Sequence, residues 1–193
     1  MESALIVSCT ETHTALFTEM LNAASINQIA VLQSCNEARR LLMEQDFDLV
    51  IVNAPLRDES GESLSRYLAS KSASQVILVV KSEYFGAVSA VCEDNGVLTI
   101  SKPVNKDVFW SALTLAKSAW NKIRHIQAEN VRLRQKIEEI RIVDRAKWIL
   151  VSHLNISEQE AHRSIEKQAM NMRSTRRAIA ERIIKAYENE GEA

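Results

Sequence analysis

The sequence has few of the residues that interrupt helices. It contains four glycines and two prolines among 193 residues, and none of them lies between Pro103 and Gly191. Glycine and proline are the commonest signals that end a helix. Their absence from this interval predicts that the C-terminal half of the chain is entirely helical.

Long apolar runs and cysteine clusters are also missing. No apolar run approaches the roughly 20 residues that a membrane span needs, and a start with Glu2 lacks the basic and apolar parts of a signal peptide. The cysteines, Cys9, Cys35 and Cys92, are few and widely spaced, which argues against a disulfide framework or a metal site. We therefore expect a cytoplasmic protein with reduced thiols, no metal and no other cofactor.

The formal net charge is only -1, but the charges are unevenly distributed. Residues 1–117 contain nine Lys and Arg and fourteen Asp and Glu, whereas residues 118–193 contain fifteen and eleven. Within residues 141–187 ten basic residues stand against five acidic ones. This asymmetry suggests two functional modules, the second with a possible polyanionic partner.

The first hundred residues alternate between apolar runs and amphipathic segments. Continuous apolar runs are typical of strands that are buried on both faces, and the segments between them have helical spacing. This alternation predicts an α/β domain with a five-stranded parallel sheet between two layers of helices, in a flavodoxin-like order. The expected strands are 4–9, 29–33, 48–53, 75–80 and 97–100, and the clearest helices are 13–24 and 36–45.

Asn105 is expected to cap a helix from about residue 106 to about residue 153. At about 1.5 Å per residue it is roughly 70 Å long, which is too long to be buried in one small domain. Apolar residues recur in it at spacings of three and four, which predicts a coiled-coil dimerisation segment at 119–142 and a homodimer. The expected seam contains Ile123, Ile126, Asn130, Leu133, Ile137 and Ile140.

Asn130 occupies an a position of this heptad pattern. A single polar a residue lowers stability but selects a parallel two-stranded coil in one register. The alternative is that the helix packs on its own N-terminal domain and leaves Asn130 exposed.

Two shorter helices are expected after the long one. Ser157 and Glu160 have the spacing of a capping box, which predicts a helix start at this point. Ser174 and Thr175 are the expected cap of the last helix.

The segment "DFDLVIVNAPLRDESG" (46–61) is an apolar strand that breaks into a polar turn, and it resembles the third strand of bacterial receiver domains. In that family the strand ends in an aspartate that accepts a phosphoryl group, and an acid pair after the first strand holds Mg²⁺. Asn53 stands at the phosphoacceptor position. The acid-pair positions hold Cys9 and Thr10 in "SCTE".

Only part of the remaining receiver site matches. The family's lysine is present as Lys102, and we interpret it as a residual lysine before Pro103 rather than as a phosphate-binding group. The family also has a Ser or Thr after the fourth strand, whose hydroxyl binds a phosphoryl oxygen. Here that position falls at Val80 or Lys81, and Ser82 follows one residue too late.

We therefore interpret residues 1–118 as a pseudo-receiver, because an amide cannot form an acyl phosphate. An alternative is that the nearby carboxylates of Glu11, Asp58 and Glu59 replace the missing ones and support residual phosphorylation.

The C-terminal stretch "VDRAKWILVSHLNISEQEAHRSIEKQAMNMRSTRRAIAERII" (143–184) resembles an ANTAR domain, a three-helix module that we assign to residues 143–193. Trp148 departs from the family, which usually has a small residue at this position. The matching elements are Arg145-Ala146-Lys147, Ile149-Leu150, Leu154, Ser157 with Glu160-Ala161, Ala169-Met170, the basic turn 173–177 and Ile179-Ala180.

The ANTAR resemblance implies RNA binding and no enzymatic activity. Such domains recognise hairpins in leader transcripts and prevent a terminator from forming, so the whole chain is similar to ANTAR response regulators whose receiver is degenerate. Control would then come from a regulatory protein partner or from dimer concentration. The alternative is a protein–protein adaptor. The basic residues expected to contact RNA phosphates are Arg145, Lys147, Arg163, Lys167, Arg173, Arg176 and Arg177.

Overall fold

The computed structural model describes residues 1–190, with side chains as far as Tyr187. The chain divides into two compact units, Met1–His125 and Ile126–Ala193, called below the N-terminal unit and the C-terminal unit. None of the helices in the described part of the chain is long and apolar enough to cross a membrane.

The N-terminal unit contains a five-stranded parallel sheet in the order β2-β1-β3-β4-β5, as predicted. Residues at the carboxyl ends of neighbouring strands are paired: Val7 with Val52, Asn53 with Val79, and Lys81 with Lys102. The end of β3 therefore lies between the ends of β1 and β4. The strands are β1 (Ser3–Val7), β2 (Gln28–Leu32), β3 (Leu49–Asn53), β4 (Gln75–Lys81) and β5 (Leu98–Lys102).

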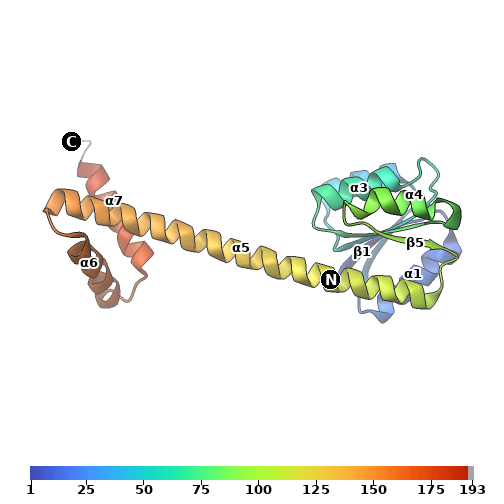
Figure 1. Ribbon diagram of the computed structural model, residues 1–193. Coiled ribbons are helices and arrows are strands. Elements are labelled where there is room, and N and C mark those ends of the chain that lie inside the picture. The colour runs from blue at the N-terminus through green and yellow to red at the C-terminus, as the bar shows by residue number, and fades with distance from the viewer. Residues whose placement is uncertain (191–193) are drawn as a thin grey trace. The chain divides into compact units, whose positions relative to one another are not determined.

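Helices cover both faces of this sheet (Figure 1). Alternate strand residues point to opposite faces, so β3 contributes Val50 and Val52 to one core and Leu49 and Ile51 to the other. The first core includes residues of α2 (Cys35–Glu44), α3 (Glu62–Lys71) and α4 (Ser82–Glu93), and the second includes residues of α1 (Glu11–Ala23) and of the start of α5 (Lys106–Leu154). The sequence pattern did not predict helices α3 and α4.

The three cysteines are free thiols. Cys35 and Cys92 are buried in the first core, and burial raises the pKa of both thiols. Cys9 is half-buried.

The predicted long helix is confirmed. Helix α5 contains 49 residues, and the Asn105 side chain accepts a hydrogen bond from the Val108 N–H at 2.7 Å, so it caps the helix as expected. In the N-terminal unit α5 buries Phe109, Leu113 and Ala116. It continues into the C-terminal unit, where Ala146 and Leu150 are buried.

The C-terminal unit packs the end of α5 with α6 (Glu158–Asn171) and α7 (Arg176–Glu190). The predicted capping box is confirmed, because the Ser157 side chain accepts from the Glu160 N–H and the Glu160 side chain accepts from the Ser157 N–H. The cap of α7 is Thr175, whose Oγ1 accepts from the Ala178 N–H at 3.2 Å. The core consists of Ala146, Leu150, Ala161, Ile165, Ala169, Ile179, Ala180 and Ile183.

Candidate functional site

Asn53 closes β3 at the carboxyl edge of the sheet and is only 1% exposed. Its Nδ2 donates a hydrogen bond to Ser8 Oγ at 2.9 Å and lies 3.3 Å from His13 Nδ1. Its Oδ1 is buried and has no hydrogen-bond partner in the described residues. The side chain at the expected phosphoacceptor position is thus held by a hydroxyl and an imidazole.

Lys102 lies at the end of β5 and reaches back toward this edge. Its Nζ donates to the Ala54 carbonyl, and its own carbonyl accepts from the Ser82 hydroxyl. Burial lowers the pKa of Lys102, and the positive charge of Lys81 adds to that effect. Lys102 is therefore connected to the residue that follows Asn53.

His13 lies on the first turns of α1, beside the same edge. Burial and the charge of Lys102 lower the pKa of its imidazole. A neutral imidazole leaves Nδ1 able to accept from the Asn53 amide. A cavity of about 630 Å³ opens here, lined by His13, Lys81, Ser82, Glu83, Lys102 and Pro103.

The expected acid-pair residues lie beside this cluster, and neither forms a hydrogen bond with Asn53 in the part of the chain that is described. Cys9 Sγ donates to the Gln33 carbonyl at 2.9 Å, and the Thr10 N–H donates to Ser8 Oγ at 3.2 Å. Ser8 belongs to the "SCTE" segment that replaces the acid pair in the sequence, whereas His13 is a contact of Asn53 that the sequence did not single out. The register of β1 against β3 would have indicated Ser8, because Val7 pairs with Val52.

The nearby carboxylates are engaged elsewhere. Asp58 accepts hydrogen bonds from the Cys35 and Asn36 N–H groups at 3.0 and 2.9 Å, at the start of α2. Partial burial opposes the charged form of Asp58, but these backbone donors outweigh it and lower the pKa of the carboxyl. Glu59 pairs with Arg39 at 2.7 Å.

The residues at this edge do not fit a magnesium ion. Mg²⁺ requires several hard oxygen ligands, usually carboxylates, whereas Asn53 contacts a hydroxyl and an imidazole, and Lys102 binds the neighbouring Ala54 carbonyl. Glu11 lies exposed in the first turn of α1. Across residues 1–190 no group of three or more His, Cys, Asp or Glu is placed to hold a metal.

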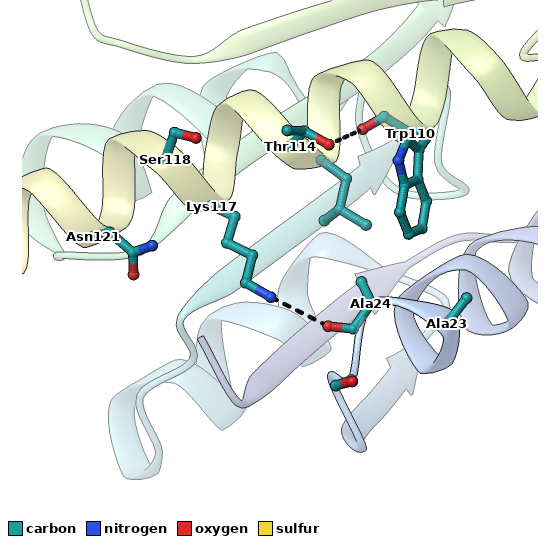
Figure 2. Close-up of a pocket in the computed structure, with 9 residues that line it drawn as sticks. Ala23, Ala24, Trp110, Thr114, Lys117, Ser118 and Asn121 are labelled. Carbon is teal, nitrogen blue, oxygen red and sulfur yellow. Dashed lines mark hydrogen bonds between the residues drawn. The ribbon is translucent and has the colours of Figure 1, made fainter.

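A second cavity of the N-terminal unit, about 410 Å³, lies between α1 and α5. In Figure 2 Trp110 and Lys117 of α5 lie opposite Ala23 and Ala24 at the end of α1, and Lys117 Nζ donates to the Ala24 carbonyl at 3.4 Å. Lys117 is the single ionisable residue among those that line it. We find no arrangement for acid–base chemistry in this cavity.

The expected seam residues form an exposed apolar stripe on α5. Ile126, Leu133, Ile137 and Ile140 are 47–52% exposed in the single chain, and Ile123, in the N-terminal unit, is also exposed. Asn130 Nδ2 donates to the Ile126 carbonyl at 3.1 Å, within the same helix. The pairing of this stripe with a second copy remains a prediction.

Three of the expected RNA-binding residues take part in ion pairs. Lys147 Nζ lies 2.7 Å from Asp144 and 2.9 Å from Glu158, and its side chain is only 15% exposed. Its hydrogen bonds to Asp144 and Glu158 raise the pKa of the ammonium group. Arg176 lies 3.6 Å from Glu166 and Arg177 lies 2.8 Å from Glu181. Lys147 thus joins α5 to α6, and Arg176 joins α7 to α6.

Arg163, Lys167 and Arg173 are exposed, and none of them forms an ion pair within the described ranges. Arg163 and Lys167 lie one helical turn apart on α6. Arg173 lies in the turn between α6 and α7 with a φ of 48°. Arg145, on α5, is exposed as well.

Comparison with known proteins covers both units. Residues 131–184 match the family model described as ANTAR domain. Over 166 residues, the chain is 24% identical to "Transcriptional regulatory protein PdtaR" of Mycobacterium tuberculosis, covering 86% of this chain and 81% of that protein.

Solved receiver domains share the N-terminal fold. A signal receiver domain from Pseudomonas fluorescens Pf-5 has a TM-score of 0.56 at 19% identity, covering 64% of this chain and 92% of that one. The receiver domain of the TMAO respiratory system response regulator TorR has a TM-score of 0.53 at 20% identity, covering 63% and 98%. These likenesses establish the receiver fold of the N-terminal unit.

Proposed function

We propose that this chain, which joins a receiver-like α/β domain to an ANTAR domain, is a dimeric RNA-binding regulator of transcription antitermination. The observation that carries the proposal is the ANTAR match at residues 131–184. The resemblance to a transcriptional regulatory protein over most of both chains supports it. The RNA would be a hairpin in a leader transcript, and binding would stabilise it against a competing terminator.

The charges of the C-terminal unit support an RNA partner. Arg163, Lys167 and Arg173 form no ion pair in the described structure, so they are available to neutralise phosphates and release counterions. Hydrogen bonds from Ser157 lower the pKa of the Glu160 carboxyl, and Arg163 is nevertheless close enough to Glu160 for its charge to add to that effect. Arg176 and Arg177 lie in the first turn of α7, where the helix dipole also favours an anion. Lys147 supports the interface by fixing α6 against α5 rather than by facing the RNA.

The exposed stripe on α5 supports a homodimer. An isolated helix would leave Ile126, Leu133, Ile137 and Ile140 in water, and a second copy in parallel would cover them. Asn130 would exchange its bond to the Ile126 carbonyl for one across the seam. Two ANTAR domains would then be available to bind two hairpins.

The structure around Asn53 supports control without aspartyl phosphorylation. An amide replaces the nucleophilic carboxylate, the donor set does not fit Mg²⁺, and Asp58 and Glu59 are bound to α2 and Arg39. A regulatory protein that binds the N-terminal unit or sequesters the dimer is the mechanism we favour.

A protein–protein adaptor is the second candidate function. It is favoured by the ion pairs of Lys147, Arg176 and Arg177, which reduce the positive charge that is available to RNA. In that case the C-terminal helices would bind a protein and would retain no hairpin.

The deciding experiment is selection from a pool of RNA hairpins that share one stem and carry a randomised loop. We expect the full-length protein to enrich particular loops at moderate salt, and to bind them with an affinity that falls as salt rises. Failure to enrich any hairpin would favour the adaptor.

A further inference from the structure

Trp148 is the most exposed aromatic side chain among the described residues. It lies on α5 in the C-terminal unit and is 72% exposed, against 56% or less for Tyr67, Tyr84 and Trp110. Large aromatic side chains left in water are typical of binding surfaces, where an indole supplies much contact area at little entropic cost. We therefore expect a binding partner to cover the Trp148 side chain.

The coiled-coil seam does not supply that partner. Continued beyond Ile140, the heptad pattern places Asp144 at the next a position and Lys147 at the next d position. Lys147 is paired with Asp144, and it is also paired with Glu158 of α6. From here the helix buries Ala146 and Leu150 in its own unit, so the apolar seam ends before Trp148.

The surroundings of Trp148 favour a nucleobase over a phosphate. A cavity of about 270 Å³ beside the indole is lined by Asp144, Lys147, Trp148, Val151 and Glu158. The two carboxylates outnumber the lysine and would repel a phosphate. Carboxylate oxygens also accept hydrogen bonds from the amino groups of bases.

Basic residues lie close along the helix. At 3.6 residues per turn, Arg145 and Arg141 lie one and two turns before Trp148 on nearly the same face of α5. Arg141 lies 4.0 Å from Glu138, so a phosphate would share it with that carboxylate. A phosphate backbone that approaches these arginines would direct an unpaired base toward the indole. Single-stranded loops are the parts of RNA whose bases are free to stack on aromatic side chains.

We propose that Trp148 is a stacking platform for one unpaired base of the bound hairpin loop. This inference rests on the proposed RNA-binding function. The indole covers one face of the base, and the edge of the base lies against Asp144 and Glu158, which favours bases that present an amino group.

The test uses the full-length Trp148→Ala variant and a hairpin recovered by the wild-type protein from the randomised-loop pool. Stacking on an aromatic residue contributes enough that its loss should weaken binding roughly 5- to 150-fold. The slope of log affinity against log salt should stay unchanged, because no phosphate contact is lost. Trp148→Phe should restore most of the affinity. Trp110→Ala is the matched control, a tryptophan of the N-terminal unit that is 43% exposed.

A second measurement identifies the stacked base. Loop bases are replaced one at a time by abasic sites, and each hairpin is titrated with the wild type and with Trp148→Ala. One abasic position should weaken wild-type binding and have no further effect on the variant.

The outcomes separate the two proposals. If no hairpin is enriched, both fall. If a hairpin is enriched but Trp148→Ala binds it as tightly as the wild type, only the stacking platform is overturned. The same holds if Trp148→Ala lowers the slope of log affinity against log salt, as the loss of an arginine would. If the variant instead changes the dimer dissociation constant without RNA, a second copy covers the indole and the stacking proposal is wrong.

Discussion

Replacing Arg163 and Lys167 together by alanine should reduce both the affinity for RNA and its dependence on salt. Both side chains are exposed on α6, one turn apart, and neither forms an ion pair in the described part of the chain, although the charge of Arg163 acts on Glu160. A cation that is not already neutralised releases a full counterion when it meets a phosphate. An arginine such as Arg177, which lies 2.8 Å from Glu181, must share its charge with that carboxylate or separate from it before it binds a phosphate. Its contribution to counterion release is therefore smaller.

The magnitude follows from counterion release. Each phosphate contact to single-stranded RNA contributes about 0.7 to the slope of log affinity against log salt, so two lost contacts lower the slope by roughly 1.4. Between 50 and 200 mM salt, a fourfold range, this difference changes the ratio of wild-type to variant affinity by roughly sevenfold. Arg177→Ala should change the slope by less than about 0.7.

The assay is a titration of one enriched hairpin at several salt concentrations between these limits. Arg40→Ala with Lys71→Ala is a matched control, since it removes one exposed arginine and one exposed lysine from the N-terminal unit. Equal losses of slope from the two double variants would mean that binding is diffuse attraction to the whole protein. A larger loss from Arg177→Ala alone would refute the argument that ion pairing determines which cations meet the RNA.

Three further predictions concern the other sites. Incubation with acetyl phosphate and Mg²⁺ should leave the intact mass unchanged, because Asn53 is an amide; an acid-labile gain of one phosphoryl group would contradict the pseudo-receiver interpretation. Ile126→Asp with Ile137→Asp should give monomers by light scattering, since each would bury an unpaired charge in the seam, whereas Val131→Asp, one position outside the stripe, should leave the dimer intact. Lys147→Met should lower the free energy of unfolding of the protein by about 1 kcal/mol in urea titrations. The loss is no larger because the two carboxylate partners of Lys147 are exposed and water can solvate them again. An unchanged midpoint would show that the two ion pairs do not stabilise the packing of α6 on α5.

Some local features of the fold were less evident from the sequence than the sheet and the long helix. Helix α4 contains Gly86 and apolar residues without a clear 3.6-residue period, so neither a helix nor a strand pattern stood out. The choice between Ser174 and Thr175 as the cap of α7 depends on the turn at Arg173, whose positive φ is a backbone detail without a sequence signal.

Features that depend on local order could be read from the amino-acid sequence alone. Continuous Val, Ile and Leu mark the buried strands, and the absence of glycine and proline marks the long helix. Ser157 and Glu160 mark the start of α6. These signals are visible in the sequence because hydrophobic periodicity and helix capping act over a few residues. The contacts of Asn53 and the ion pairs of Lys147 could not be read from the sequence, because they join segments that are distant in it or depend on packing. Ser8 meets Asn53 because β1 and β3 pair in one register across 45 residues, and Lys147 meets Glu158 because α6 folds back on α5. Such contacts depend on how distant segments pack, and a one-residue shift in the register of β1 against β3 would remove the contact between Ser8 and Asn53.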